Sequence, residues 1–312
     1  MSHYNKELFI AIDLVKKASE IVEWFKKSGF KSYRKGDNSP TTLADFASQI
    51  FIVSKLKEEF PDDQIFAEES ESNFIQQKEK NIIKKCYREL RFDNITDLKT
   101  TLNYKGNPSN RKWTIDPIDG TIGFQKGLLF AIGISLLVDS ETEISAISVP
   151  NYNENGLAIF SAEFGQGAKA SYGEKPFVPI SVSRQNDVKK ARMCHSLHYD
   201  MPWVIQFAKK IGIKASNIIS LDSMAKFCMV ADGSVDLYIK PIIGYKAYSW
   251  DFSPGDLLVR EAGGKVTDLD EERLKFKNEK CILRAPGIIS TNNILHDEVS
   301  DFIRNNFFSI EV

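Results

Sequence analysis

Three short acidic segments that lie far apart in the chain constrain this sequence more than any other feature. They read FAEES at 66–70, WTIDPIDGT at 113–121 and WD at 250–251. If the fold brings them together, their carboxylates cannot all stay ionised side by side unless cations neutralise them. Clustered carboxylate oxygens are ligands that suit Mg²⁺. The sequence therefore predicts a metal-dependent enzyme that acts on phosphate.

Composition excludes several classes of partner. The 312 residues carry 41 Lys and Arg against 42 Asp and Glu, so no net charge draws the chain to nucleic acid or to an anionic membrane. A small ligand is therefore the better default. Separately, we expect a monomer whose substrate is a small phosphorylated molecule. The start of the chain lacks the apolar core of a signal peptide, and the four scattered cysteines form no CxxC pair. These features predict a cytoplasmic protein with reduced thiols.

The pattern of apolar residues predicts two lobes. A helical pattern over 6–25 ends at Gly29, a second helix begins after Thr42, and a strand at 64–67 leads into Glu68. An antiparallel meander follows, with strands at 113–115, 131–138, 143–149, 156–163 and 177–182. Beyond Asp187 strands alternate with helices at 202–211, 223–231 and 254–262. We expect an α+β lobe over 1–187 with most metal ligands, and an α/β lobe over 188–312 with the substrate-binding residues and Asp251.

The segment from Asp116 to Thr121 has two interpretations. Asp-Pro and Asp-Gly are turn dipeptides, so a tight loop after a strand accounts for them. The functional interpretation is that Asp116 and Asp119 point to the same side of the turn and bind cations together with the Ile118 carbonyl. Gly120 would then leave the backbone open to a phosphate. The Thr121 hydroxyl would orient a water.

The other acidic positions also have ordinary explanations. Paired glutamates such as Glu68 and Glu69 usually lie on a solvated surface. Here they follow an apolar strand, so one can project into a site while the other stays outside. Helix capping alone would explain Asp251. A favourable interaction with the dipole of a helix that begins just before it would explain Asp45. The residues alone leave these alternatives open.

In their order along the chain, these segments resemble the signature of the lithium-sensitive, Mg²⁺-dependent phosphatases related to inositol monophosphatase and fructose-1,6-bisphosphatase. That signature is an E-E pair, a D-P-[IL]-D-G-T turn, and a W-D before a helix that ends in G-G, here Gly263 and Gly264. The resemblance covers most of the chain. It implies α+β and α/β lobes in a layered α-β-α-β-α sandwich, with the metal site in the cleft between them.

Within that superfamily the chain is most similar to the 3′(2′),5′-bisphosphate nucleotidases. These enzymes remove the 3′-phosphate of adenosine 3′,5′-bisphosphate (PAP) to give AMP. Four stretches carry the similarity, namely KGDNSPTTLADFASQ at 35–49, CHS at 194–196, LDSMAK at 221–226 and DLYIK at 236–240. The last three lie where that family holds the nucleotide.

The resemblance assigns a role to each matching residue. It implies that two or three Mg²⁺ ions are held by Glu68, Asp116, the Ile118 carbonyl, Asp119 and Asp251. It implies that Asp45 and Thr121 orient and deprotonate the attacking water. The nucleotide would contact His195, Ser223, Lys226 and Lys240, with Ser223 and Lys226 one helical turn apart, and Tyr245 is a candidate for the adenine pocket. Inhibition by Li⁺ is also implied.

Three positions depart from the family pattern. Ala67 stands where a Gly usually precedes the glutamates, and it adds one methyl group to a strand end. Lys240 stands in the place of an arginine, and a lysine cannot grip phosphate through two parallel hydrogen bonds. The run FSPG at 252–255 replaces small residues after W-D. The last two changes bear on substrate choice.

Rival functions share parts of this pattern. The nearest is an inositol polyphosphate 1-phosphatase acting on inositol 1,4-bisphosphate, and dual activity is compatible with the sequence, as is action on the phosphosulfate relative PAPS. A simple inositol monophosphatase is disfavoured by the LDSMAK segment and the long stretch at 71–111. A silent scaffold or nucleotide sensor is disfavoured because every metal and water ligand that the resemblance requires is present.

Overall fold

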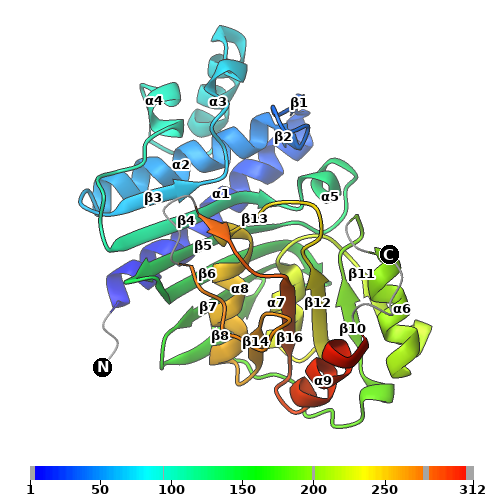
Figure 1. Ribbon diagram of the computed structural model, residues 1–312. Helices are drawn as coiled ribbons and strands as arrows, with labels where there is room; N and C mark the ends of the chain where they lie inside the picture. The colour runs from blue at the N-terminus through cyan, green and yellow to red at the C-terminus, as the bar shows by residue number, and fades with distance from the viewer. Residues whose placement is uncertain (1–3, 94, 199–200, 277–280, 307–312) are drawn as a thin grey trace.

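The computed structural model describes residues 4–93, 95–198, 201–276 and 281–306 (Figure 1). Its larger sheet has seven strands in chain order. The first pair is parallel and each later pair is antiparallel. The strands are β3 (Gln64–Ala67), β4 (Arg111–Asp119), β5 (Ala131–Val138), β6 (Glu141–Asn153), β7 (Gly156–Glu163), β8 (Gly167–Tyr172) and β9 (Val178–Pro179).

Two long helices cover one face of this sheet. They are α1 (Asn5–Ser28) and α2 (Leu43–Glu59), and they are joined by the hairpin of β1 (Ser32–Arg34) and β2 (Pro40–Thr42). Thr42 caps α2 by accepting hydrogen bonds from the amides of Ala44 and Asp45. Shorter helices follow on the same side or at the strand ends, namely α3 (Gln77–Glu89), α4 (Leu98–Leu102) and α5 (Thr121–Gln125). Among the described residues, none of the helices has the length and apolar character needed to cross a membrane.

The smaller sheet has five strands in the order β11-β10-β12-β16-β14. They are β10 (Met193–His195), β11 (Ile218–Ser220), β12 (Leu237–Pro241), β14 (Lys265–Thr267) and β16 (Gly287–Thr291). A separate two-residue pair, β13 (Ala247–Tyr248) with β15 (Ile282–Leu283), lies beside it. The helices of this half are α6 (Met201–Ile211), α7 (Ala225–Ala231), α8 (Ser249–Glu261) and α9 (His296–Asn306).

Three apolar cores hold the layers together. The first joins α1 and α2 to one face of the larger sheet, for example through Ile134 of β5. The second joins the other face of that sheet to α7, α8 and the smaller sheet, and includes Phe227 and Tyr238. The third packs α6 and α9 on the far face of the smaller sheet and includes Leu237 and Ile239. Because neighbouring residues of β12 enter different cores, its two faces are both buried, and the result is the layered α-β-α-β-α sandwich seen in Figure 1.

Several elements differ from the sequence prediction. β4 continues through the expected turn to Asp119, with a register shift against β5 between Asp116 and Asp119. α8 begins at Ser249, so Pro254 lies inside the helix instead of in its first turn. Ser223 precedes α7 and has φ +78°, so it does not share a helical face with Lys226. Strand β8 was not predicted, and β9 is shorter than the predicted 177–182.

A buried histidine makes the stability of the smaller lobe depend on pH. The ring nitrogens of His296 lie 3.1 Å from Thr267 Oγ1 and 3.0 Å from Thr291 Oγ1, and burial lowers the pKa of His296 to about 4. The unfolded chain therefore binds a proton in a range where the folded protein does not. The neutral His296 side chain contributes fully to stability above its ordinary pKa of 6.5, and this contribution is lost as the pH falls toward 4.

We expect His296→Gln to have a lower free energy of unfolding than the wild type at pH 7. Between pH 7 and pH 4 the free energy of unfolding of the variant should fall by on the order of 1–3 kcal/mol less than that of the wild type. Urea unfolding at the two pH values measures both effects. Parallel losses of stability in the two proteins would contradict this account of His296.

Candidate functional site

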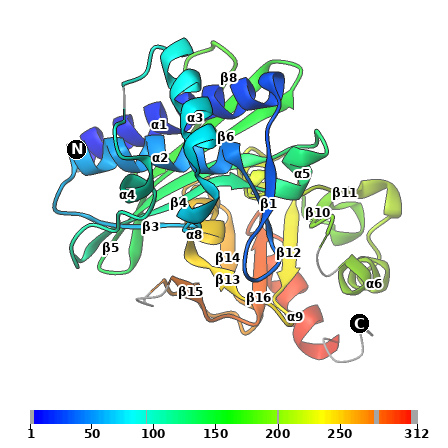
Figure 2. The ribbon, with the colours of Figure 1, turned by 90° about the horizontal axis from the view of Figure 1, so that it is seen from above.

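A cleft of about 1090 Å³ opens between the two sheets. Its walls come from elements that are distant in sequence: the C-terminal ends of β3 and β4, the end of β12, the start of α8, and the turn of the β1–β2 hairpin. Figure 2 shows this hairpin reaching from the layer of α1 and α2 toward β12 and β13. All three acidic segments of the sequence line the cleft.

The end of β4 supplies two of the carboxylates. Asp116 accepts a hydrogen bond of 3.1 Å from the Ile118 amide, which fixes its side chain within the strand end. Asp119 accepts a hydrogen bond from the Met224 amide of the other lobe. Gly120 has φ +86°, and a Cβ there would lie 3.1 Å from Ser223 Cβ. The strand can therefore pass this close to the second lobe only because residue 120 is a glycine.

The start of α8 supplies the third carboxylate. Asp251 lies in the first turn, and its Oδ2 accepts a hydrogen bond of 3.2 Å from the Tyr248 amide. It therefore caps the helix, as the ordinary interpretation of its sequence position holds. It also faces the site, because the carboxylate oxygens of Asp116, Asp119 and Asp251 lie within 4.8 Å of one another. The two interpretations of Asp251 are thus compatible.

These three carboxylates carry more negative charge than the surrounding protein neutralises. Burial, followed by the charges of Glu68, Asp119 and Asp251, raises the pKa of Asp116 well above its usual value. Burial raises the pKa of Asp119 to about 6, although the charges of Lys226 and Lys240 oppose it. Burial and the charge of Asp119 raise the pKa of Asp251 to about 7.

A cation removes this penalty. Three carboxylate oxygen donors that lie close together and resist ionisation, one of them on the buried Asp116, are suited to a hard divalent ion. The donor set of Asp116, Asp119 and Asp251 therefore fits a metal ion.

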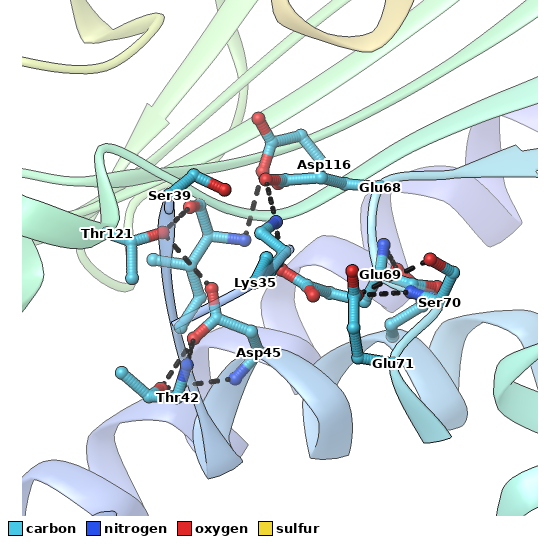
Figure 3. A network of polar contacts seen from close by, with 12 residues as sticks. Lys35, Ser39, Thr42, Asp45, Glu68, Glu69, Ser70, Glu71, Asp116 and Thr121 are labelled. Carbon is cyan, nitrogen blue, oxygen red and sulfur yellow. Dashed lines mark hydrogen bonds and ion pairs between the residues drawn. The ribbon is translucent and has the colours of Figure 1, made fainter. Parts of the chain in front are cut away.

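A lysine neutralises the adjoining pair of glutamates. Lys35 Nζ, from the hairpin turn, lies 2.7 Å from Glu68 Oε1 and 2.9 Å from Glu69 Oε1 (Figure 3). Burial opposes a charge on Lys35, but the two carboxylates outweigh burial and raise the pKa of Lys35. Glu69 is only 2% exposed, and its Oε2 has no hydrogen-bond partner among the described residues. The prediction that one glutamate stays outside is wrong: Glu69 is the more buried of the two.

Asp45 is a further buried carboxylate and lies next to the cleft. Asp45 is fully buried, and its Oδ2 accepts hydrogen bonds of 2.8 Å from the Thr42 amide and 2.5 Å from the Thr42 hydroxyl. Its Oδ1 lies 3.2 Å from Thr121 Oγ1, which in turn lies 3.1 Å from the Ile118 carbonyl oxygen (Figure 3). Burial raises the pKa of Asp45 to about 7. Thr121 lines the cleft and Asp45 does not, so the threonine hydroxyl separates this carboxyl group from the cleft.

The structure brings most of the predicted substrate residues into the same cleft. Ser223, Lys226, Lys240 and Tyr245 line it, as does Gly120. Lys226 is 3% exposed and donates hydrogen bonds of 2.6 Å and 3.3 Å to the Ser223 and Leu221 carbonyls. Burial lowers the pKa of Lys226 to about 8, with Asp119 opposing that shift. Lys240 Nζ lies 5.4 Å from the centre of the Tyr245 ring.

His195 is placed differently. It is fully buried in β10, with Nδ1 2.8 Å from the Ser196 carbonyl oxygen and Nε2 2.7 Å from Ser220 Oγ. It does not line the cleft, whereas its neighbour Ser196 does.

Two charged residues of the cleft have no role in the sequence prediction. Lys35 belongs to the matching segment at 35–49, but its contact with two glutamates depends on how the hairpin folds back. Asp222 lines the cleft, accepts a hydrogen bond of 3.1 Å from the Leu197 amide, and pairs with His198. The Asp-Ser pair at 222–223 was a signal for both positions, but only Ser223 was singled out.

Comparison with known proteins places the chain in a family. The model of the inositol monophosphatase family matches residues 3–301. The chain therefore belongs to the inositol monophosphatase family. It is similar to a 3′(2′),5′-bisphosphate nucleotidase of Oryza sativa, with 33% identity over 94% of this chain and 92% of the relative. It is also similar to a 3′(2′),5′-bisphosphate nucleotidase of Emericella nidulans, with 28% identity over 96% of this chain and 98% of the relative.

Solved structures share the fold. A Thermotoga maritima IMPase superposes with a TM-score of 0.71 at 22% identity, over 98% of this chain and 100% of that chain. An inositol monophosphatase from Anabaena (Nostoc) sp. PCC 7120 superposes with a TM-score of 0.69 at 22% identity, over 97% of both chains. The layered sandwich expected from the sequence is confirmed.

We expect the thermal stability of the protein to depend on divalent ions, because the acidic triad fits a metal ion. A ligand that binds only the folded state stabilises it by mass action. We expect added Mg²⁺ or Mn²⁺ to raise the melting temperature of the wild type by several degrees. Asp251→Asn should melt higher than the wild type in a chelator, because one of three repelling carboxylates is gone, and should lose most of the ion-dependent rise. Differential scanning calorimetry with and without chelator measures both effects.

Asp62→Asn is the matched control, because this exposed carboxylate lies in a turn outside the cleft. It should retain the full ion-dependent rise. An undiminished rise in Asp251→Asn would contradict the assignment of Asp251 to a metal site.

Proposed function

We propose that this protein is a phosphoric monoester hydrolase that removes the 3′-phosphate of PAP to give AMP and phosphate. One observation carries the proposal: the carboxylates of Asp116, Asp119 and Asp251 share a cleft with two lysines, Lys226 and Lys240. The first group suits cations and the second suits phosphate oxygens. Full-length similarity to proteins named 3′(2′),5′-bisphosphate nucleotidase supports this choice of substrate.

The metal ions of this proposal are two or three Mg²⁺. Their ligands would be Glu68, Asp116, the Ile118 carbonyl, Asp119 and Asp251. Bound Mg²⁺ supplies charge neutralisation for the phosphate and acidifies a coordinated water. In this proposal the protein's own part would be to bring these five oxygen donors together, and three of them, from Asp116, Asp119 and Asp251, lie within 4.8 Å of one another.

The attacking water would be activated by Thr121 and Asp45. Thr121 Oγ1 and Asp45 Oδ1 are 3.2 Å apart. A water bound to Thr121 Oγ1 would therefore be connected to Asp45 through a single hydroxyl group. The water oxygen forms a bond to phosphorus, and its proton passes through the threonine hydroxyl to Asp45. The bond from phosphorus to the ribose 3′-oxygen breaks, and that oxygen takes a proton from solvent. Thr42 holds Asp45 in position for this transfer.

Ser223, Lys226 and Lys240 would bind the rest of the substrate. Lys226 and Lys240 line the same cleft and bring positive charge near Asp119, where their charges oppose the rise in the Asp119 pKa that burial causes. Gly120 leaves the backbone accessible beside them. Tyr245 stays a candidate for the adenine pocket. His195 would act from beneath the cleft wall, through Ser196.

Other parts of the prediction remain open to experiment. Hydrolysis of PAPS or of inositol 1,4-bisphosphate, inhibition by Li⁺, a monomeric state and a cytoplasmic location stay predictions. The division into lobes at residue 187 is also a proposal. It is supported by the end of the first sheet at Pro179 and the start of the second at Met193.

Asp119→Asn should lower kcat/KM for PAP by more than about 10²-fold, the scale of one lost electrostatic stabiliser. Phosphate release in the presence of Mg²⁺ measures this loss. The Asp62→Asn control should keep wild-type activity. Near-normal turnover by Asp119→Asn would refute the proposed role of the triad.

A substrate panel tests the choice of reaction. The wild type should release phosphate from PAP faster than from inositol 1,4-bisphosphate at equal concentration, and release should stop in a chelator. Millimolar Li⁺ should slow it. Binding of PAP without any Mg²⁺-dependent phosphate release would favour the nucleotide-sensor alternative instead.

A further inference from the structure

An imidazole ring bridges two charged side chains beside the cleft. His198 follows β10, and Nε2 of its ring lies 2.9 Å from Nζ of Lys126, the C-cap residue of α5 (Figure 2). Nδ1 of the same ring is hydrogen-bonded to Oδ2 of Asp222, in the loop between β11 and α7. Asp222 lines the cleft, whereas His198 and Lys126 do not. The bridge can therefore act on the cleft only through Asp222.

The two partners of His198 determine which ring nitrogen carries the proton. A carboxylate only accepts hydrogen bonds, and an ammonium group only donates them. Asp222 Oδ2 therefore requires a proton on Nδ1, and Lys126 Nζ requires a lone pair on Nε2. The neutral ring with its proton on Nδ1 satisfies both partners at once. The opposite tautomer would bring two acceptors together at Asp222 and two donors together at Lys126.

Asp222 in turn fixes the loop that carries it. Its Oδ1 accepts a hydrogen bond of 3.1 Å from the Leu197 amide, and the residue is 7% exposed. One position earlier, the Leu221 amide donates a hydrogen bond of 3.1 Å to the His195 carbonyl. A Cβ on Gly123 of α5 would lie 3.7 Å from Asp222 Cβ, so the loop also packs against that helix. The loop is therefore held from both β10 and α5.

The conformation of this loop places two residues that are proposed to bind substrate. Ser223 has φ +78°, in the left-handed region that a serine rarely adopts unless its surroundings hold it there. In this conformation its carbonyl accepts a hydrogen bond of 2.6 Å from Lys226 Nζ, and the Leu221 carbonyl accepts a second one of 3.3 Å. The position of the Lys226 ammonium group therefore depends on the loop at 221–223.

We propose that His198 is a positioning residue for the substrate site. Its ring, in the tautomer that Lys126 selects, holds Asp222 and thereby keeps Ser223 and the Lys226 ammonium group in place. This inference rests on the proposed function and deepens it by naming a residue outside the cleft that sets substrate affinity. The proposed metal ligands lie on other segments, so loss of the bridge should raise KM more than it lowers kcat.

Asp222→Asn tests the role of the tautomer. The new amide can keep its oxygen on the Leu197 amide, but its NH₂ group then points at the proton on Nδ1 of His198. We expect KM for PAP to rise about tenfold, the scale of one lost charge-assisted hydrogen bond, with a smaller change in kcat.

Lys126→Met provides a matched rescue. Without the ammonium group, His198 can move its proton to Nε2 and accept a hydrogen bond at Nδ1 from the introduced amide. Lys126→Met alone should change KM by less than about threefold, because Lys126 is exposed. The double variant with Asp222→Asn should return to within about threefold of that value. Lys169→Met, at an exposed lysine on β8, should not rescue Asp222→Asn.

Nuclear magnetic resonance reports the tautomer without any substrate. Long-range ¹H–¹⁵N spectra at about pH 8, above the ordinary pKa of imidazole, should show the proton of His198 on Nδ1 in the wild type. In the double variant the proton should be on Nε2. The signal of His198 is assigned by its loss in His198→Ala.

Calorimetry separates this inference from the proposed function. The dissociation constant for PAP should follow the same pattern across the variants as KM. That pattern in a protein that releases no phosphate would refute the proposed function and support the role of His198.

Three results would overturn this role. The first is a wild-type spectrum in which the proton of His198 is on Nε2. The second is an unchanged KM and dissociation constant in Asp222→Asn. The third is a double variant in which the effects of Asp222→Asn and Lys126→Met simply add.

Discussion

The structure depends on the cost of burying several carboxylates in one place. Asp116, Asp119 and Asp251 face one another with raised pKa values, and Asp45 lies fully buried beside them. Removing one ionised carboxylate from water costs several kcal/mol unless a partner charge compensates it. Lys35 provides that compensation for Glu68 and Glu69. The charges of Lys226 and Lys240 only partly offset the burial of Asp119, so we propose that a cation completes the triad. A cation in this place could also neutralise the negative charge of a phosphate ester, which is why the site suits the proposed substrate.

The fold meets this requirement by building the site from both sheets. The larger sheet contributes the ends of β3 and β4, the smaller one contributes Lys240 of β12, and α8 between them contributes Asp251. The hydrogen bond from the Met224 amide to Asp119 joins the two halves at the centre of the site. The site is therefore complete only when the lobes are packed together. The same cleft leaves room beside the triad for the remainder of a substrate.

Much of the framework could be predicted from the sequence, because long periodic segments dominate it. The helix over 6–25 corresponds to α1, the cap at Thr42 begins α2, and the strand at 64–67 is β3.

Local turn signals were less reliable. The Asp-Pro and Asp-Gly dipeptides predicted a loop, but pairing with β5 keeps that segment in β4 as far as Asp119. Pro254 lies inside α8 because the capping contacts of Tyr248 and Asp251 start the helix earlier. The contacts of Lys35 and the buried position of Glu69 depend on how the hairpin folds back, which no local pattern encodes.

The central claim is that the buried carboxylates form a binding site for divalent cations. Crystals grown with Mn²⁺ and measured at the manganese absorption edge test it most directly. The account predicts anomalous density among Asp116, Asp119 and Asp251, with a further peak next to Glu68 and the Ile118 carbonyl. Crystals that hold Mn²⁺ elsewhere on the protein, with no anomalous density among these carboxylates, would contradict it.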